Sequence, residues 1–307
     1  MSHRVLVTGG AGFIGSALVR EFSARGLQMS ILDNLSFGRR DHVEIPEGNF
    51  FKVDLLDAPA VARTVREIAP QWVIHLAAIH FIPYCNEHPY EASNINLQGT
   101  ANVLDAVREV PSVEKVFFAS TAAVYADSRA PVSELSSTGA MDIYGLTKLV
   151  GERLIREFEL ATRVPSVIGR LFNAYGPRET NPHLIPEILR QVHEGKRALQ
   201  LGNIATRRDY IHTSDMVRAI FLLMQAETAA VDVFNIGTGV SYTAKDVVEY
   251  FERAADCAFE ITVASDRVRK IDRALLQADI TKIRAATGWE PTVAFEDGIR
   301  VLVKNRA

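Results

Sequence analysis

Cysteine is scarce in this sequence. Only Cys85 and Cys257 occur among 307 residues, and neither belongs to a CxxC pair or to a cysteine–histidine cluster. A disulfide framework and a structural zinc site both need more thiols at closer spacing. The sequence therefore predicts a protein of a reducing compartment that holds no metal.

Long apolar runs and an excess of positive charge are also missing. No stretch approaches the roughly 18 unbroken apolar residues of a membrane-spanning helix, and the first residues enter a strand pattern without the segments of a secretory signal. The formal net charge of -3 gives no basic field for nucleic acid. We expect a cytoplasmic protein with no membrane and no nucleic-acid partner.

The first half of the chain contains a regular alternation of strands and helices. Short β-branched runs predict strands at residues 4–8, 29–33, 49–52, 72–75, 116–119 and 166–171. Helical patterns between them include residues 15–25, 58–68, 96–107 and 144–159. Strands regularly separated by helices are typical of an α/β fold with a doubly wound parallel sheet.

A smaller lobe is predicted after residue 171, where several prolines interrupt this rhythm. We expect a helix at 187–194, strands at 200–201 and 260–263, and a strand at 233–236 that returns to the main sheet. No flexible linker is present, so the lobes interleave: residues 1–172 plus about 210–240 form the sheet domain, and about 173–209 plus 241–307 form a C-terminal α+β lobe. The cleft between them is the expected ligand site.

Three glycines at a spacing of three follow the first strand and precede the first helix. Gly9 allows a tight turn, Gly12 lets backbone amides approach a pyrophosphate, and Gly15 lets the helix pack on the strand. The N-terminus of that helix, with Phe13 and Ile14, supplies positive potential for phosphates. The position of the motif predicts a dinucleotide site, with these residues among its contacts.

Asp33 ends the second strand, eighteen residues after Gly15. A carboxylate there can accept hydrogen bonds from both hydroxyls of an adenosine ribose, which favours NAD over NADP, although Arg39 and Arg40 leave NADP open. The alternative for Asp33 is an Asx-turn at the start of a loop.

Two further segments could contact the same dinucleotide. Asn34 adjoins Asp33, and Asp54 with Leu55 follows the third strand, where the pair could contact the adenine. Asp54 could equally well be a helix N-cap.

Tyr144 and Lys148 stand at i and i+4 on one face of a predicted helix. A neighbouring ammonium favours the phenolate, so Tyr144 could act as general base in alcohol oxidation and as acid in the reverse step. Ser120 and Thr121 follow a strand at the reactive edge of the sheet, where a hydroxyl can hydrogen-bond the reacting oxygen. The alternatives are a solvated helix face and a polar pair that caps a strand.

Taken in order, these motifs resemble the NAD-dependent epimerase/dehydratase family of extended short-chain dehydrogenases. The resemblance also includes His75-Leu76-Ala77-Ala78, the run of residues 170–178 and Arg208-Asp209-Tyr210-Ile211, and it covers nearly the whole chain. It implies a Rossmann-type fold, tightly bound NAD+ and a nucleotide-sugar substrate. It also implies that Leu76, Ala77, Ala78, Ser120, Tyr144 and Lys148 contact the cofactor.

The residues after Thr121 distinguish the reactions of this family. Its dehydratases carry an Asp-Glu pair there and its decarboxylases a glutamate, whereas this sequence has Ala122 and Ala123 and is similar to the 4-epimerases. The resemblance thus implies that Tyr144 deprotonates the 4-hydroxyl while hydride passes to NAD, and that the ketose is then reduced on its other face. A 4-ketoreductase or dehydrogenase, a dehydratase, a decarboxylase and a catalytically silent NAD-binding regulator are the alternatives.

The resemblance also assigns the nucleotide end of the substrate. Asn173 would contact the diphosphate, Arg208 and Arg269 would pair with its charge, and Arg267 competes with Arg269 for this role. The segment with His183 and Leu184 would lie over the nucleotide.

One segment departs from the family pattern, because Cys85 stands where many relatives have serine. A packed thiol is the expected role of Cys85, and His80 and Tyr84 could line the sugar pocket. By analogy with the family we also expect a homodimer formed through the helices at 96–107 and 144–159.

Overall fold

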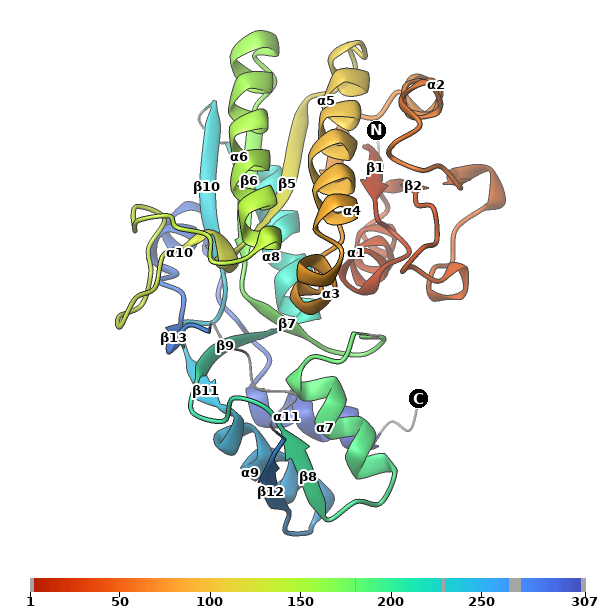
Figure 1. Ribbon diagram of the computed structural model, residues 1–307. Helices are drawn as coiled ribbons and strands as arrows, with labels where there is room; N and C mark the ends of the chain where they lie inside the picture. Colours follow the sequence, from red (N-terminus) through yellow and green to blue (C-terminus); the bar gives the residue numbers. More distant parts are fainter. Residues whose placement is uncertain (1–2, 180, 228–229, 265–271, 305–307) are drawn as a thin grey trace.

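A computed structural model describes residues 3–179, 181–227, 230–264 and 272–304 (Figure 1). Its centre is a seven-stranded, all-parallel sheet in the order β10-β6-β5-β4-β1-β2-β3. The strands are β1 (Arg4–Thr8), β2 (Gln28–Leu32), β3 (Phe50–Phe51), β4 (Trp72–His75), β5 (Lys115–Thr121), β6 (Ser166–Leu171) and β10 (Val231–Ile236). The order reverses direction between β1 and β4, as in a doubly wound sheet, and confirms the predicted fold class.

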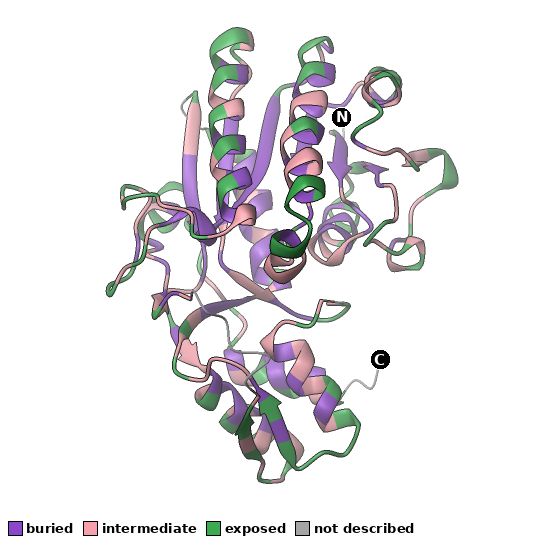
Figure 2. Ribbon diagram, viewed as in Figure 1, coloured by how far each residue is buried: buried purple, intermediate pink, exposed green. Residues whose placement is uncertain are grey.

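Helices cover both faces of this sheet. One face carries α1 (Phe13–Ala24) and α8 (Thr213–Gln225), whose buried residues include Leu18, Phe22 and Met216. The other carries α2 (Ala58–Ile68), α5 (Thr100–Arg108) and α6 (Ile143–Thr162). Each fully buried Leu or Phe contributes about 1.5–3 kcal/mol, and Figure 2 shows these buried faces turned toward the strands.

Short helices and helical turns occupy connections for which the sequence predicts no helix or strand. They are the helices α3 (Ile82–Glu87), α4 (Pro89–Ser93) and the turns η1 (Arg40–His42), η2 (Glu47–Asn49) and η4 (Ala122–Val124). The helix predicted at 96–107 begins with a π-helical turn, η3 (Asn94–Gly99), before α5. Within the part of the chain that the structure describes, none of the helices combines the length and apolarity needed to cross a bilayer.

The smaller lobe lies below the carboxyl ends of the sheet (Figure 1). Its strands β7 (Asn173–Tyr175), β9 (Arg207–His212), β11 (Ser241–Thr243) and β13 (Leu275–Leu276) form one sheet, and β8 (Ala198–Leu201) pairs with β12 (Glu260–Val263). The helices α7 (Leu184–His193), α9 (Ala244–Ala255) and α11 (Phe295–Lys304) complete it around an apolar cluster that contains Phe251 and Ile299.

The chain crosses between the lobes repeatedly. The strand predicted to return to the main sheet does so as β10, beside β6. The predicted division assigns residues 241–307 to the smaller lobe, but Ile283 of α10 (Thr281–Thr287) and Trp289 are buried in the apolar cluster of the large sheet. The chain therefore returns to the larger lobe once more than the sequence predicts, through α10 and Trp289.

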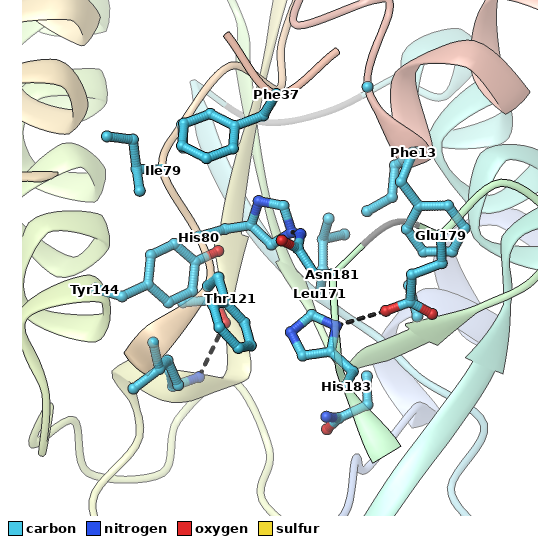
Figure 3. Close-up of a pocket in the computed structure, with 18 of the residues that line it drawn as sticks. Phe13, Phe37, Ile79, His80, Thr121, Tyr144, Leu171, Glu179, Asn181 and His183 are labelled. Carbon is cyan, nitrogen blue, oxygen red and sulfur yellow. Dashed lines mark hydrogen bonds and ion pairs between the residues drawn. The ribbon is translucent and has the colours of Figure 1, made fainter. Parts of the chain in front are cut away.

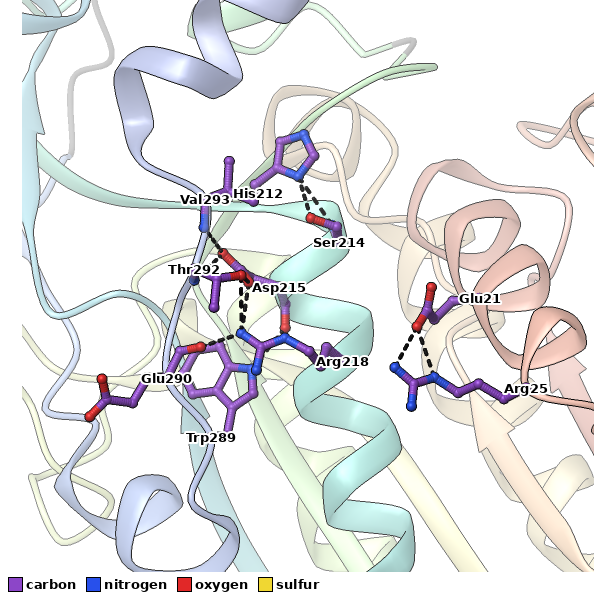
Figure 4. A network of polar contacts seen from close by, with 10 residues as sticks. All are labelled: Glu21, Arg25, His212, Ser214, Asp215, Arg218, Trp289, Glu290, Thr292 and Val293. Carbon is purple, nitrogen blue, oxygen red and sulfur yellow. Dashed lines mark hydrogen bonds and ion pairs between the residues drawn. The ribbon is translucent and has the colours of Figure 1, made fainter.

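Asp215, in the first turn of α8, holds this late segment in place (Figure 4). Its buried carboxylate accepts hydrogen bonds from the backbone nitrogens of Thr292 (2.9 Å) and Val293 (2.8 Å) and pairs with Arg218 at 2.9 Å. The Trp289 indole donates to the Asp215 carbonyl oxygen at 3.1 Å. One side chain thus joins α8 to the segment that leads into α11.

We expect Asp215→Asn to lower the free energy of unfolding by about 1–3 kcal/mol at pH 7, because buried donors lose their charged acceptor. Burial opposes ionisation, but the hydrogen bonds and Arg218 hold the pKa of Asp215 below its ordinary value. The stabilisation is therefore complete above the unfolded pKa of about 3.9 and is lost as the pH falls through the lower folded pKa. Urea unfolding of the variant and the parent at pH 7 and at pH 3 measures the difference in unfolding free energy at each pH.

Asp297→Asn is the matched control, because that carboxylate is 62% exposed and its salt bridge, among the described residues, is with Arg300 on its own helix. We expect it to change stability by less than about 0.5 kcal/mol. Equal stability of the Asp215 variant and the parent at pH 7 would contradict the role assigned to this network.

Candidate active site

A cavity of about 1080 Å³ lies at the carboxyl ends of the parallel strands, between the two lobes (Figure 3). Ligand pockets commonly span roughly 300–1,000 Å³, so this one is large. The predicted residues that line it are Gly9, Gly12, Phe13, Ile14, Asp33, Asn34, Asp54, Leu55, Leu76, Ala77, Ala78, His80, Ser120, Thr121, Tyr144, Lys148, Asn173, His183, Leu184 and Arg208. The structure thus brings both halves of the predicted site to one space.

The glycine turn has the geometry that a dinucleotide site requires. Gly9 has φ +70°, which favours glycine, and the Gly12 amide donates to the Gly9 carbonyl oxygen at 3.2 Å. A Cβ on Gly15 would collide with the Gly9 carbonyl oxygen and lie 2.7 Å from the Gly10 Cα. The first turn of α1 therefore packs directly against the glycine turn. The backbone amides of this first helical turn face the cavity, where they would stabilise an anion.

Asp33 combines the two roles considered for it. Its carboxylate lines the cavity, and its oxygens accept from the Leu35 amide at 2.8 Å, as in an Asx-turn, and from the Ala11 amide at 3.0 Å. Burial raises the pKa of Asp33, and these backbone hydrogen bonds oppose that shift. Each carboxylate oxygen has a second lone pair, so both can still accept from ligand hydroxyls.

Asp54 is not a helix N-cap. Its carboxylate accepts from the Asn34 side chain at 2.8 Å and from the Leu56 amide at 2.9 Å, whereas the N-cap of α2 is Asp57, which accepts from the Ala60 amide. The link between Asn34 and Asp54 joins the loops after β2 and β3 at the edge of the cavity.

Thr121, Tyr144 and Lys148 meet above the end of β5. Thr121 is the last residue of that strand; its hydroxyl accepts a hydrogen bond from the Ala123 amide at 3.1 Å and lies near the Tyr144 phenol (Figure 3). A Cβ on Gly145 would lie 2.5 Å from the Ala123 carbonyl oxygen, so α6 runs very close to the turn that follows β5. This close approach sets Tyr144 beside Thr121.

The electrostatics of this pair differ from the sequence-based expectation. Burial raises the pKa of Tyr144 and lowers the pKa of Lys148 to about 7. The spacing predicts a lowered phenol pKa, but both side chains are enclosed, and desolvation disfavours each charged form. In the protein alone Tyr144 therefore holds its proton.

A buried ion pair that the sequence did not lead us to expect lies behind the catalytic face. Arg170 donates to both carboxylate oxygens of Glu152, at 2.9 and 2.8 Å, and Ser120 donates to Glu152 at 2.6 Å. Glu152 follows Lys148 by four residues, so the helical spacing was a signal for it. The hydroxyl hydrogen of Ser120 points to Glu152, which limits any contact of Ser120 with a cofactor to its oxygen or backbone.

The substrate half of the cavity is lined by Asn173, Leu184 and Arg208. Arg208 forms an ion pair with Asp272 and donates to the carbonyl oxygens of Arg207 and Arg273, each at 2.8 Å. The guanidinium is thus fixed in position and partly neutralised. The predicted Arg269 and its competitor Arg267 lie outside the described residues.

Two further residues, Arg273 and Asp209, shape this half of the cavity, and neither was predicted from the sequence. Arg273 lines the cavity and donates to the carbonyl oxygens of Ala123 (2.8 Å) and Tyr125 (3.0 Å), which anchors the turn after β5. Asp209 is fully buried and accepts from the amides of Thr238, Gly239 and Ala278. Its role in the Arg208–Ile211 motif is therefore structural.

Tyr84 does not belong to the cavity wall, in contrast to the prediction. Its hydroxyl donates to Glu91 at 2.9 Å, and its ring packs edge-on against Phe37. Cys85 is fully buried and donates to the Ile79 carbonyl oxygen, and burial raises the pKa of its thiol to about 12, as expected for a packed thiol. In the described residues, no group of three or more His, Cys, Asp or Glu is placed to hold a metal.

Comparisons with known proteins agree with this geometry. A family model described as GDP-mannose 4,6 dehydratase matches residues 6–302. The chain is 32% identical to UDP-glucose 4-epimerase of Bacillus subtilis over 95% of this chain and 94% of the relative. It is 29% identical to dTDP-glucose 4,6-dehydratase of Neisseria gonorrhoeae over 98% and 94%.

A solved structure is similar over nearly the full length. The Thermus thermophilus UDP-glucose 4-epimerase in complex with NAD superposes with a TM-score of 0.89 at 34% identity, covering 98% of this chain and 97% of that one. The similarity thus extends over both lobes that line the cavity.

Proposed function

Because the chain belongs to the NAD-dependent epimerase/dehydratase family of extended short-chain dehydrogenases, whose model is described as GDP-mannose 4,6 dehydratase, we propose that it is a nucleotide-sugar 4-epimerase. The observation that carries this proposal is the surroundings of Thr121. Ala122 and Ala123 are buried beside it, so neither of the two positions directly after the strand carries a carboxylate that could eliminate water or assist decarboxylation. The epimerase relatives favour the same reaction.

The cofactor is NAD, as in the similar solved structure. The glycine turn and the N-terminus of α1 fit its pyrophosphate, and Asp33 fits the ribose hydroxyls. Arg39 and Arg40, which left NADP open in the sequence, are paired with Asp41 at 2.6 Å and Glu47 at 2.9 Å. When bound, NAD would supply the hydride acceptor for oxidation of the sugar and the hydride donor for its reduction.

The residues of the chain handle the proton. Tyr144 receives the proton of the sugar 4-hydroxyl during oxidation and returns it during reduction, while Thr121 hydrogen-bonds the reacting oxygen. Because burial raises the pKa of Tyr144, formation of the phenolate needs positive charge nearby. Lys148 would provide that charge, and the oxidised nicotinamide of bound NAD would add to it.

The substrate is a nucleotide diphosphate sugar that spans the lower half of the cavity, with its diphosphate near Asn173 and Arg208.

We also propose a homodimer formed through α5 and α6. On α6, Leu146, Val150 and Leu160 are exposed apolar residues that a partner helix would cover.

Proton NMR of the full-length protein with catalytic NAD and a panel of UDP-, GDP-, dTDP- and CDP-hexoses tests the reaction. We expect a C4 epimer without net NADH. A stable keto or unsaturated sugar would indicate a dehydratase, loss of carbon dioxide a decarboxylase, and stoichiometric NADH a dehydrogenase. No conversion in the panel would favour a silent NAD-binding protein.

A further inference from the structure

Lys148 would carry the positive charge that the proposed proton transfer needs, but no acidic side chain balances it. The residue is buried on α6, with 3% of its surface exposed. Among the residues that the structure describes, no carboxylate forms a salt bridge with Lys148. Glu152 on the same helix is paired with Arg170. A lone ammonium group in a buried site tends to lose its proton, so another favourable contact is needed to keep it charged.

The ring of Phe118 provides such a contact. Nζ of Lys148 lies over this ring, 4.8 Å from its centroid. A cation within about 6 Å of an aromatic centroid is attracted by the negative face of the ring, most strongly where water is excluded. Phe118 is fully buried in β5, the strand that ends at Thr121. The charge of Lys148 therefore has an aromatic partner in place of a carboxylate.

The packing of α6 on β5 holds the two groups together. A Cβ on Gly151 would lie 2.5 Å from Cζ of Phe118, so the helix rests directly on the edge of the ring. Gly151 follows Lys148 by about one helical turn and lies on the same side of the helix. Phe118 also belongs to the buried apolar cluster that contains Ile155 and Phe158 of this helix. The ring and the lysine cannot separate unless this core opens.

The neighbours of Lys148 that could titrate do not compete with the ring. The titratable side chains of the elements around it are His75, His80, Cys85, Asp142, Tyr144 and Glu152. Burial lowers the pKa of His75 to about 3 and of His80 to about 4, so both are neutral near pH 7. Burial also raises the pKa values of Cys85 and Tyr144, which therefore keep their protons. Asp142 caps α6 at the Gly145 amide.

We propose that Phe118 is a positioning residue of the site, whose ring face holds the ammonium group of Lys148 in its charged form beside Tyr144. The use of that charge in turnover rests on the proposed function, whereas the contact itself does not. A phenolate at Tyr144 is stabilised by the ammonium charge, so the proton of the sugar is harder to remove when Lys148 is neutral. Removal of the ring should lower the pKa of Lys148 and weaken turnover at alkaline pH.

The pKa of Lys148 can be measured directly in the full-length, NAD-loaded protein. Lysine labelled with ¹³C at Cε reports the protonation of Nζ by NMR, and the Lys148→Arg variant identifies the resonance. Phe118→Leu and Phe118→Met each keep an apolar side chain and remove the aromatic face. We expect both to lower the pKa of Lys148 by about one pH unit, a tenfold change in its protonation equilibrium.

Phe117→Leu is the matched control. Phe117 adjoins Phe118 on the same strand and is equally buried, but it belongs to the apolar cluster on the opposite face of the sheet. The two Leu substitutions remove the same atoms from the core, so we expect similar losses of unfolding free energy in urea. The Phe117 variant should keep the parental pKa of Lys148.

The pH dependence of kcat gives a second readout, with the hexose that the panel identifies. The ammonium form supports turnover and is lost as the pH rises through the pKa of Lys148. A lower pKa therefore moves the alkaline fall in kcat down by about one pH unit in the Phe118 variants. KM should stay close to the parental value, because Phe118 does not line the cavity.

The outcomes distinguish the two proposals. A parental pKa of Lys148 in both Phe118 variants, or an equal shift in Phe117→Leu, would overturn the inference and leave the epimerase intact. A lowered pKa with an unmoved kcat profile would also overturn it, because the charge would then not be used in turnover. If the parent converts no hexose while the pKa falls in the Phe118 variants alone, the epimerase proposal fails and the contact with Phe118 is supported.

Discussion

Tyr144→Phe should lower kcat for the nucleotide-sugar substrate by roughly 10²–10⁴-fold, the usual contribution of a positioned acid–base group. Phenylalanine keeps the ring that packs against Ile79 and Cys85 and removes only the hydroxyl that Thr121 contacts. Among the described residues of α6 that line the cavity, Tyr144 is the one that carries a hydroxyl, so the variant loses the proposed acceptor of the sugar proton. Turnover is followed by NMR and NAD binding by the quenching of protein fluorescence.

The control for this variant is Tyr84→Phe, which removes a phenol outside the cavity wall. We expect it to turn over as the parent does. The Tyr144 variant should still bind NAD and show an unchanged thermal midpoint. If it turned over substrate at the parental rate, the assignment of Tyr144 as the acid–base group would be wrong.

Gly15→Ala should lower the free energy of unfolding by roughly 3 kcal/mol and weaken NAD binding strongly, because overpacking here forces backbone apart. The added Cβ would collide with the Gly9 carbonyl oxygen and with Gly10, and backbone atoms cannot rotate away as a side chain can. Relief of the clash must move α1 away from the glycine turn, whose amides would bind the pyrophosphate of NAD. Urea unfolding and a fluorescence titration with NAD measure the two effects.

Gly48→Ala is the matched control, because an added Cβ there meets nothing within 4 Å. We expect a change of less than about 0.5 kcal/mol and unchanged NAD affinity. Parental stability of the Gly15 variant would show that the turn can widen at little cost, in contrast to the packing described here.

The large sheet was predictable because strands and helices alternate along the chain and each kind of element has its own spacing of apolar residues. β1, β4 and β6 have the predicted bounds, since each is a short apolar run between turn residues. The sequence did not predict three short elements, α3, α4 and the turn η4. The first turns of α3 and α4 contain proline, and η4 is too short for a helical period to be seen. Their form depends on packing against α6.

The predicted site residues were found by type and spacing, but their environment was not. The spacing of Tyr144 and Lys148 shows that they share one face of a helix. It does not show that both side chains are buried, and burial determines the direction of both pKa shifts. Glu179 and His183 also stand four residues apart in the sequence. Two prolines nearby predict a loop, and only the folded chain shows that the Glu179 carboxylate pairs with His183 and is buried against the cavity.

The order in which the chain leaves the ribosome has a consequence for the larger lobe. Its outermost strand, β10, ends at Ile236, and its apolar core is completed by Ile283 and Trp289. Domains that are contiguous in sequence can fold as soon as they are synthesised, but this one stays unfinished until nearly the whole polypeptide has emerged. The nascent chain must therefore keep the apolar faces of β5 and β6 protected through most of translation, and a message truncated before codon 283 should yield a product that chaperones retain or proteases remove.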